Sequence, residues 1–514
     1  MSKILWIDDE EDLLKPYFLY LQDKGYEVES ASNGQDAIDM CHENVYDIIF
    51  LDENMPGLSG LETLARIKDI RPSIPVVMIT KNEEEDIMDM AIGNKIADYL
   101  LKPVNPKQII LTLKKHIHQK DIISDQTTNT YRQEFPKIGM QIDECRNADD
   151  WKSLYKKLLH WEMELDETDN EMKEILQMQK SEANNAFAKF VAKSYEGWIG
   201  STDRPMLSQD VMKKVVFPLL DNGDKVFMIV IDNFRYDQWL AIRDDVAEYF
   251  TIDSDEPYFS ILPTATQYSR NAIFSGLTPA QIQELYPQYW VDEEEDEGKN
   301  MKEEELLSTV FERFRKKYSH SYAKINNSDA GESLIRKIDE LGSNDLNVCV
   351  MNFVDMLSHA KTDSKMMREL VKDESAYRSL TQSWFRHSAA KLLFKTIASK
   401  GYKVVLTTDH GTIRVKNPIK VVGDKATNVN LRYKVGKNLG YSKKEVLEML
   451  QPKKVGLTSP NISSAYIFAT GDDFFAYPNN YNYYVSYYKD TFQHGGVSME
   501  EMIIPLVVMN PKLG

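Results

Sequence analysis

Residues 225–232 read KVFMIVID, six consecutive apolar residues between a lysine and an aspartate. The stretches NVCVMNFVD (347–355) and KVVLTTDH (403–410) have the same form, an apolar run that leads to an aspartate. Short, continuous apolar runs are typical of strands buried on both faces of a parallel sheet. Since the carboxyl ends of parallel strands meet at one edge of a sheet, we expect the polar residues at these three ends to lie together.

The rest of the chain falls into two further parts. Residues 1–120 alternate the apolar runs KILWID, YEVESA, YDIIFLD, PVVMIT and ADYLLKP with helix-like segments, which predicts a (βα)5 repeat with a parallel sheet. Residues 121–204 lack strand signals and predict a bundle of three helices, with breaks at FPKIG (135–139) and DETDN (166–170). Strands return in residues 205–514. The predicted class is an α/β multidomain protein with a (βα)5 domain, a helical bundle and a larger α/β domain.

Composition excludes several classes of protein. A net charge of -18 argues against whole-surface binding to nucleic acid or to anionic membranes. Three dispersed cysteines cannot build a disulfide framework, which suits a reducing compartment. The apolar runs are too short to span a membrane, and the first residues carry acids where a signal peptide needs bases. We expect a cytoplasmic protein without membrane insertion.

Acidic residues end the first and third N-terminal runs. Asp8 and Asp9 follow the first run, and Asp52 ends the third. Asp9 and Asp52, with the main-chain carbonyl of Asn54, would supply part of the oxygen shell that Mg²⁺ prefers. Asp52 could then accept a phosphoryl group as a carboxylate nucleophile. Acids at strand ends are also common helix caps, which is the alternative for each residue alone.

The fourth and fifth runs end in residues suited to sense that phosphate. Lys102 would neutralise phosphoryl oxygens, and Thr80 would form a hydrogen bond to the new phosphate. We expect Tyr99 to be half-buried and to change rotamer in response. Through IDDE, LDENMPGLSG, the lone threonine and LLKP, this part resembles the receiver domain of two-component response regulators. The resemblance implies a phosphoacceptor at Asp52, acidic Mg²⁺ residues at Asp8 and Asp9, and a switch formed by Thr80, Tyr99 and Lys102.

Carboxylates and imidazoles gather in the C-terminal part. The candidates are Asp232, Asp355, His359, Asp409, His410 and His494. Asp355 and His359 are spaced i, i+4 and would share one face if the chain is helical there, whereas the two glycines of FQHGG let the backbone fold tightly around His494. This mixture of ligands suits Zn²⁺ or Mn²⁺ and makes a soft thiolate site improbable. With a threonine oxygen there are seven ligands, which implies two ions per chain. A histidine taken alone is more often an ordinary core residue.

The segment PTATQYSRNAIFSG (263–276) offers a nucleophile, either Thr264 or Thr266. A helix is expected to begin there, with amides that point at an anion near Ser269, Arg270 and Asn271. Two cations can stabilise the entering and leaving oxygens of an in-line displacement. Phosphate-ester hydrolysis is therefore the predicted chemistry.

Residues 205–514 resemble the alkaline phosphatase superfamily, and within it the PglZ-type domains, through VIDNFR, PTATQYSR, the pair Asp355 and His359, TTDHG and FQHGG. The resemblance implies Thr266 as nucleophile. It also implies two metal sites, one with Asp232, Thr266, Asp409 and His410 and one with Asp355, His359 and His494. Phosphodiesterase relatives keep an asparagine soon after the nucleophile. Here Ser269, Arg270 and Asn271 compete for that phosphate-binding role.

Three further stretches bear on the surface of the C-terminal part. Residues 414–444 carry nine lysines or arginines and one acid, which indicates either a groove for a polyanion, with Tyr433 and Tyr441 for base stacking, or a solvated hairpin. The tyrosines of residues 477–488 alternate as in a strand pair and favour packing over a nucleotide platform. The acid-rich residues 291–305 predict a solvated insert or helix face.

The order of the three parts resembles that of response regulators associated with type IX secretion. This resemblance implies phosphorylation by a sensor histidine kinase, a homodimer on phosphorylation, zinc in the C-terminal domain, and phosphodiesterase action on cyclic or linear oligonucleotides. The residues themselves lead to phosphoester hydrolysis but not to that substrate. The alternative is a non-catalytic transcription regulator or scaffold whose metal domain binds a sigma factor or another partner.

Overall fold

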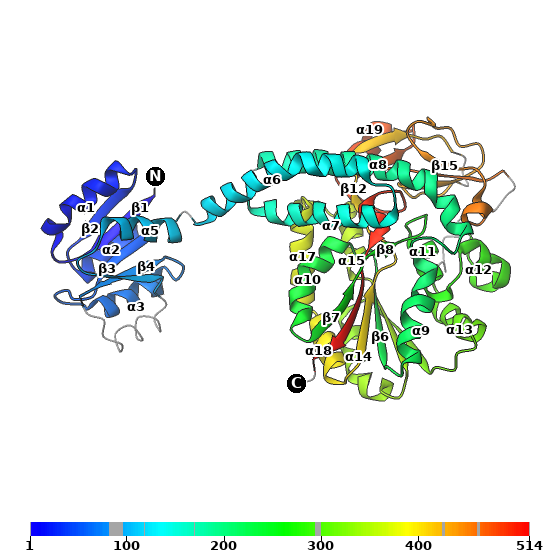
Figure 1. Ribbon diagram of the computed structural model, residues 1–514, viewed down its shortest axis with the longest axis horizontal. Helices are drawn as coiled ribbons and strands as arrows, with labels where there is room; N and C mark the ends of the chain where they lie inside the picture. The colour runs from blue at the N-terminus through cyan, green and yellow to red at the C-terminus, as the bar shows by residue number, and fades with distance from the viewer. Residues whose placement is uncertain are drawn as a thin grey trace. The chain divides into compact units, whose positions relative to one another are not determined.

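A computed structural model describes residues 2–81, 96–117, 119–168, 170–292, 300–423, 427–459 and 463–512 (Figure 1). The chain forms two compact units, Met1–Thr130 and Tyr131–Gly514. Among the helices in these ranges, none combines the length and apolar character needed to cross a membrane.

The first unit is built on a five-stranded parallel sheet. Its strands are β1 (Lys3–Ile7), β2 (Glu27–Ala31), β3 (Ile48–Asp52), β4 (Val76–Thr80) and β5 (Asp98–Leu101), in the order β2-β1-β3-β4-β5. Its described helices are α1 (Glu11–Asp23), α2 (Gly34–Glu43), α3 (Gly60–Ile70) and α5 (Pro106–His116). Apolar side chains are buried on both faces of the sheet. The predicted parallel sheet is confirmed, whereas the helix expected after the fourth strand falls in residues 82–95, outside the described ranges.

The loop after β3 closes tightly on the strand. A Cβ at Gly60 would lie 2.5 Å from the main-chain oxygen of Asp52, so only glycine fits there. Ser59 and Glu62 then form a capping box that starts α3. The sequence LDENMPGLSG therefore fixes the backbone around Asp52.

Three long helices follow, namely α6 (Gln119–Glu144), α7 (Ala148–Glu164) and α8 (Asn170–Gly200). The predicted break at residues 166–170 is confirmed, because a short 3₁₀ turn, Leu165–Glu167, ends α7. The predicted break at residues 135–139 is wrong, since α6 continues through Pro136. A proline inside a helix costs about 3 kcal/mol, and the burial of Tyr131 and Ile138 on either side offsets that cost.

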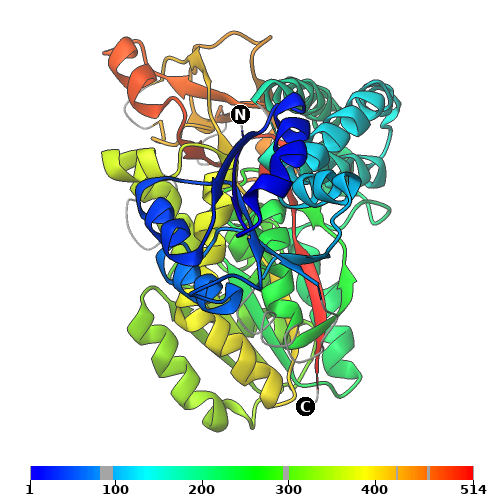
Figure 2. The ribbon, with the colours of Figure 1, turned by 90° about the vertical axis from the view of Figure 1, so that its left-hand side faces the viewer.

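The second unit contains a six-stranded sheet with helices on both faces (Figures 1 and 2). Its strands, in spatial order, are β7 (Phe250–Asp255), β20 (Leu506–Pro511), β11 (Lys403–Thr407), β6 (Val226–Ile231), β10 (Leu346–Met351) and β9 (His320–Ile325). The four strands from β11 to β9 run parallel, whereas β20 is antiparallel to both of its neighbours. The three apolar runs named first form adjacent strands, but β10 ends at Met351, so Asp355 lies in the helix that follows and not at the end of the strand as predicted.

The helices of this unit surround the sheet. They include α10 (Tyr236–Ala247), α11 (Thr266–Ser275), α13 (Glu303–Arg313), α14 (Ser328–Leu341), α15 (Phe353–Asp363), α16 (Lys365–Leu370), α17 (Glu374–His387), α18 (Ala389–Ser399), α19 (Tyr481–Tyr488) and α20 (Met499–Met502). The predicted strand SAYIFAT becomes β16 (Ala465–Phe468), which belongs to a small separate sheet with β14 (Tyr433–Gly436) and β15 (Leu447–Met449).

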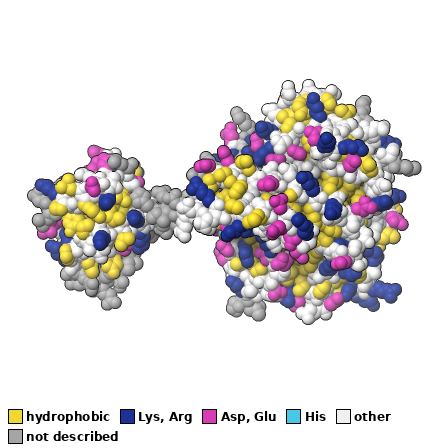
Figure 3. Space-filling view, turned by 45° about the horizontal axis from the view of Figure 1, so that its top comes forward, with side chains coloured by type: hydrophobic (Ala, Val, Ile, Leu, Met, Phe, Trp, Pro, Cys, Tyr) yellow, Lys and Arg dark blue, Asp and Glu magenta, His cyan; other side chains and the backbone are white. Residues whose placement is uncertain are grey.

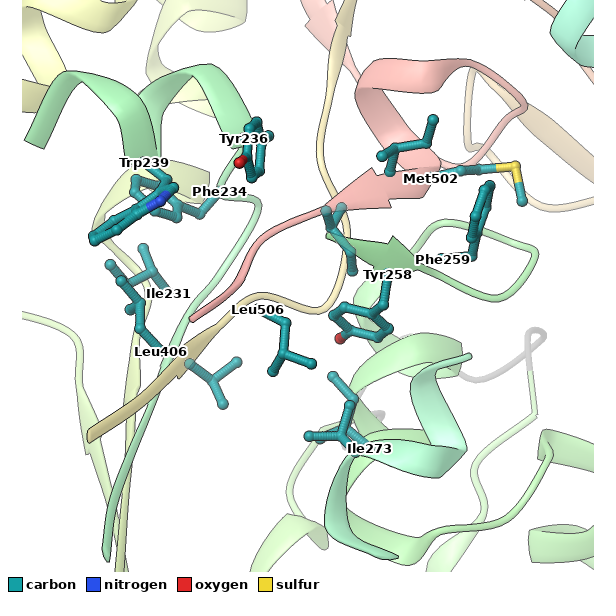
Figure 4. Close-up of a cluster of buried hydrophobic side chains, with 14 of the residues drawn as sticks. Ile231, Phe234, Tyr236, Trp239, Tyr258, Phe259, Ile273, Leu406, Met502 and Leu506 are labelled. Atoms are coloured by element: carbon teal, nitrogen blue, oxygen red, sulfur yellow. The ribbon is translucent and has the colours of Figure 1, made fainter. Parts of the chain in front are cut away.

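An apolar core supports the strand ends (Figure 4). Ile231 of β6, Leu406 of β11 and Leu506 of β20 are buried there. Phe234 and Trp239, which follow β6, are each 0% exposed. Burial of each such side chain contributes about 1.5–3 kcal/mol. This packing fixes the positions of the polar residues that follow β6 and β11.

Buried ion pairs join the long helices to the α/β part of the same unit. Arg378 of α17 is 4% exposed and binds Glu162 of α7 at 3.1 Å, Asp166 at 2.7 Å and Asp237 of α10 at 3.2 Å. Lys180 of α8 also binds Glu162, at 2.6 Å. Burial alone would raise the pKa of Glu162, but the charges of Lys180 and Arg378 lower it to about 2. Glu162 is therefore ionised, and its charge is stabilised by Lys180 and Arg378.

Replacing Arg378 with alanine removes the cation that three carboxylates share, and within the described ranges only Glu162 and Asp237 keep another cation, Lys180 and Arg235 respectively. We expect Arg378→Ala to lower the free energy of unfolding of the larger unit by about 3–5 kcal/mol. The matched control, Arg336→Ala, breaks an exposed pair with Glu332 and should change it by less than about 0.5 kcal/mol. Urea denaturation followed by tryptophan fluorescence measures both, and equal effects would contradict this account of the network.

Candidate functional site

The first unit brings three aspartates together at the carboxyl edge of its sheet. Asp8, Asp9 and Asp52 each offer a carboxylate oxygen, and these atoms lie within 4.8 Å of one another. Asp8 is 1% and Asp52 is 3% exposed, whereas Asp9 faces solvent. Lys102 Nζ lies 2.9 Å from Asp8 and 3.1 Å from Asp52. The predicted cluster therefore forms, with one lysine across it.

The electrostatics of this edge favour a bound cation. Burial raises the pKa of Asp52 to about 6, and the ammonium of Lys102 opposes that rise. Asn54 lies in the bend that follows β3. Thr80 donates a hydrogen bond of 2.8 Å to Glu53, a buried partner that the sequence did not indicate. Tyr99, which was expected to be half-buried, is 44% exposed at an edge strand.

Two clusters lie at the carboxyl edge of the large sheet. Asp232, Asp409 and His410 form the first, and all three side chains are buried. Asp232 directly follows β6, and the other two follow β11. Within the cluster the ligand atoms lie within 4.8 Å of one another. Arg270 Nη1 donates to Asp232 Oδ2 at 2.7 Å, which leaves Oδ1 of that carboxylate facing the cluster.

Thr266 is the threonine that reaches this first cluster. Its Oγ1 lies 3.4 Å from Asp232 Oδ1 and 3.2 Å from His410 Nε2. Thr264 is 0% exposed, and its hydroxyl donates to the carbonyl of Gly496 at 2.9 Å. Of the two candidates that the sequence offered, the geometry favours Thr266.

Asp355, His359 and His494 form the second cluster, again with ligand atoms within 4.8 Å of one another. Asp355 and His359 lie on α15, with 3.5 Å between Oδ2 and Nε2, so the helix expected from their spacing is confirmed. His494 stacks on His410 of the first cluster, with ring centroids 4.2 Å apart. The two clusters are therefore adjacent.

Main-chain carbonyls orient the two stacked imidazoles. His410 Nδ1 lies 3.0 Å from the oxygen of Gly411, and His494 Nδ1 lies 3.1 Å from that of Thr264. Because a carbonyl only accepts, each Nδ1 carries the proton and each Nε2 keeps its lone pair. Burial lowers the pKa of His410 to about 4 and that of His494 to about 3. Both rings are neutral at physiological pH, the form that binds metals.

The carboxylates also fit a cation. Asp409 Oδ1 accepts hydrogen bonds from the amides of Asn233 and His410 and from the hydroxyl of Thr408. Asp409 Oδ2 is buried and accepts none from any residue in the described ranges. Burial raises the pKa of Asp232 to about 6 and that of Asp409 above its usual range. A divalent cation would use the orphaned oxygen and offset the cost of these buried charges.

Close backbone contacts explain the glycines beside the histidines. A Cβ at Gly411 would lie 2.0 Å from the main-chain oxygen of Glu500. One at Gly496 would lie 2.5 Å from the oxygen of Ala469. The motifs DHG and FQHGG therefore allow two loops to pack against their neighbours while presenting His410 and His494.

Ser269, Arg270 and Asn271, the predicted substrate contacts, are each at most 2% exposed, and the side chains of the first two are bound by other groups of the chain. The Ser269 hydroxyl donates to the carbonyl of Ala265 at 2.9 Å. Arg270 is held between Asp232 and Glu303, and its Nε donates to Glu303 at 2.6 Å. Arg270 therefore holds a candidate metal ligand in place and does not face substrate.

The acidic stretch is also corrected at Glu303. This residue is 1% exposed and binds Lys324 at 2.7 Å in addition to Arg270. It is a structural anion rather than part of a solvated face. Residues 293–299 of the stretch lie outside the described ranges.

The basic stretch 414–444 does not form one hairpin. Arg432, Tyr433 and Lys434 are buried, and Arg432 pairs with Glu501 at 2.6 Å. Tyr433 is thus not available for base stacking. Residues 424–426 lie outside the described ranges. On the face of the larger unit seen in Figure 3, acidic and basic side chains are interspersed and form no continuous basic stripe.

The tyrosines of residues 477–488 do not form the expected strand pair. Those from Tyr481 onward form α19, whose tyrosines stack along the helix, as in Tyr483 on Tyr487 at 6.0 Å. No residue of α19 is buried. The tyrosine pattern does not distinguish a strand from a helix, because tyrosines spaced i, i+4 also lie next to each other on one face of a helix.

Asp52 is the phosphoacceptor that the geometry predicts, because it lies beside Lys102 within the acidic cluster. We expect acetyl phosphate with Mg²⁺ to add one phosphoryl group to the wild-type chain and none to Asp52→Ala. Asp39→Ala, an exposed aspartate of α2, is the matched control and should be modified like wild type. Intact-mass spectrometry measures the addition, and a phosphorylated Asp52→Ala chain would contradict the assignment.

Lys434 makes folding stability depend on pH. Burial lowers the pKa of this lysine from 10.5 to about 7, so the folded state binds fewer protons than the unfolded state between these values. The free energy of unfolding therefore decreases as pH falls from about 10.5 to about 7. Relative to Lys434→Met, wild type should gain about 1.4 kcal/mol from pH 8 to pH 9 in urea denaturation. A difference independent of pH would show that Lys434 is not desolvated.

Three family models match the chain. The model described as the BREX system PglZ alkaline phosphatase-like domain matches residues 211–509, the PorX response regulator linker domain matches residues 121–199, and the response regulator receiver domain matches residues 4–114. The first covers more than half of the chain.

Curated relatives and solved structures match the first unit. The transcriptional regulatory protein ResD of Bacillus subtilis is 32% identical over 129 residues, 25% of this chain and 53% of that protein. SrrA of Staphylococcus aureus is 30% identical over 113 residues, 22% of this chain and 46% of that protein. The chain spans about half the length of these curated relatives. Chemotaxis protein CheY4 of Vibrio cholerae is 29% identical, with a TM-score of 0.22, over 23% of this chain and 98% of that chain.

The predicted order of a receiver domain, a linker and a phosphatase-like domain is therefore confirmed, as is the α/β multidomain class. The chain belongs to the PglZ alkaline phosphatase-like family, with the receiver and linker domains of a PorX-type response regulator in front of the PglZ domain.

Proposed function

We propose that this response regulator hydrolyses phosphodiesters at the paired clusters of its C-terminal domain. The observation that carries the proposal is the placement of Thr266 Oγ1 against Asp232 and His410, with the second cluster joined to the first through His494. A nucleophile beside two sets of metal ligands fits phosphoryl transfer. Nucleotide phosphodiesters are the proposed substrate class.

The ligand types support two cations per chain, Zn²⁺ first and Mn²⁺ second. Asp232, Thr266, Asp409 and His410 would hold one, and Asp355, His359 and His494 would hold the other. When bound, such cations neutralise phosphoryl oxygens and lower the pKa of a nearby hydroxyl. No cysteine in the described ranges belongs to either cluster, in keeping with borderline rather than soft ions.

The chain's own groups would position the substrate. Asp232 Oδ1 is the acceptor toward which the Thr266 hydroxyl donates. Thr266 is also the first residue of α11, and no side chain caps that end of the helix. The positive end of the helix dipole would therefore face the phosphoryl oxygens. Backbone amides, rather than the buried side chains of residues 269–271, would supply this contact.

In the receiver domain we propose that a sensor histidine kinase phosphorylates Asp52. Asp8, Asp9 and Asp52, with the carbonyl of Asn54, would hold Mg²⁺. Lys102 and Thr80 would bind the phosphoryl oxygens. Formation of a homodimer on phosphorylation, a role in type IX secretion and contact with a sigma factor are predictions that the resemblance implies.

Removal of the Thr266 hydroxyl tests the hydrolase directly. We expect Thr266→Ala to retain its metal but to lower kcat on bis(p-nitrophenyl) phosphate by roughly 10³-fold or more, because the nucleophile is lost. Thr266→Ser, which keeps a hydroxyl, should retain measurable turnover. Wild-type activity in Thr266→Ala would remove this residue as nucleophile.

The same assay distinguishes a phosphodiesterase from a non-catalytic regulator or scaffold. The wild-type, metal-loaded chain should hydrolyse the diester faster than p-nitrophenyl phosphate. No turnover of either ester would favour the non-catalytic scaffold.

A further inference from the structure

A cavity of about 260 Å³ lies at the carboxyl ends of β9 and β10, beside the second metal-ligand cluster. Phe353 and Met356 of α15 line it, together with Trp384 of α17 and the asparagines Asn326 and Asn327 that follow β9. None of the lining residues belongs to either metal-ligand cluster. We call it the β9–β10 pocket.

The pocket continues the row of sites along the sheet edge. The first cluster follows β11 and β6, and Asp355 of the second lies four residues after β10. Neighbouring strands are about 4.8 Å apart, so the pocket after β10 and β9 is roughly one strand spacing farther along. Phe353 and Met356 flank Asp355 on the same helix.

The lining suits a flat, uncharged group. None of the residues that line the pocket carries a charge, although the neighbouring clusters are rich in carboxylates. Phe353 and Trp384 stack face to face, with centroids 4.6 Å apart and an interplanar angle of 5°, and so present a rigid aromatic surface. A phosphate or an ammonium group would find no opposite charge here, whereas a planar ring would find aromatic contact.

Polar side chains line the pocket as well. Asn326 is exposed, and its Oδ1 accepts a hydrogen bond of 2.9 Å from Asn352. This bond fixes the side-chain amide, so its NH₂ group is held in a defined direction. Side-chain amides recognise the donor and acceptor edges of nucleobases. At 260 Å³ the pocket is smaller than the sites of drug-sized ligands and suits a single ring system.

We propose that the β9–β10 pocket binds one nucleobase of a nucleotide phosphodiester while its phosphate lies at the metal-ligand clusters. The proposal rests on the proposed function and names the feature of the substrate that the domain selects. Stacking of one base on an aromatic side chain changes affinity by about five- to 150-fold. The enzyme should therefore prefer esters that carry a base.

The first test compares two diesters with the same leaving group, thymidine 5′-(4-nitrophenyl) phosphate and methyl 4-nitrophenyl phosphate. Wild type should show a KM at least about tenfold lower for the thymidine ester. Trp384→Leu should abolish this preference, and Trp384→Phe, which keeps a flat ring, should preserve most of it. Equal KM values for the two esters in wild type would overturn the proposal, as would a preference that survives in Trp384→Leu.

A variant at a second, exposed lining residue tests the pocket even if the Trp384 variants fail to fold. Met356 is 52% exposed, so Met356→Ala should fold, and it should weaken the preference for the thymidine ester severalfold. The matched control is Met140→Ala, an equally exposed methionine (58%) on α6. The same preference in both variants would count against the pocket.

Failure of the proposed function is recognised separately. If wild type hydrolyses neither ester, calorimetric titration with adenosine 5′-monophosphate and with ribose 5-phosphate tests the pocket by binding alone. At least about tenfold tighter binding of the nucleotide, reduced in Met356→Ala but not in Met140→Ala, would support the pocket on a non-catalytic domain. Equal binding of the two phosphates would overturn it.

Discussion

Buried carboxylates that face one another at a sheet edge are the constraint on which the C-terminal domain depends. Asp232 and Asp409 sit in the interior without enough positive charge around them, and burial raises the pKa of both. The apolar strands beneath them, the tight loops at Gly411 and Gly496 and the clamp of Arg270 hold them in this unfavourable arrangement. A site that is costly to the protein alone and complementary to cations is expected of a metal centre rather than of a structural core.

Both units place their candidate sites at the carboxyl ends of parallel strands. In the first, parallel strands place Asp8 and Asp52 beside Lys102. In the second, four parallel strands carry the two clusters, and the pocket proposed for a base continues the row. The long helices α7 and α8 are part of the second unit and are joined to it by buried ion pairs. Through Arg378, these helices are in contact with α17 and α10.

Much of this could be predicted from the sequence because the informative signals are local. Continuous apolar runs that end in aspartate indicated the central strands, and spacing of i, i+4 indicated the helix at Asp355 and His359. The outer strands β7 and β9 are half-buried and lack such runs. The ion pair between Arg270 and Glu303 joins residues far apart in the chain, so local composition could not reveal that both are interior. The helix break predicted at Pro136 is absent, because burial of neighbouring side chains outweighs the cost of a proline inside a helix.

Titration of the metal-free chain with Zn²⁺, followed by native mass spectrometry, tests most directly whether the clusters hold cations. The paired clusters predict two tightly bound ions at sites in the larger unit, one of them lost in His494→Ala. A chain that binds no Zn²⁺, or that binds it equally well when Asp232 and His494 are both replaced by alanine, would contradict the account.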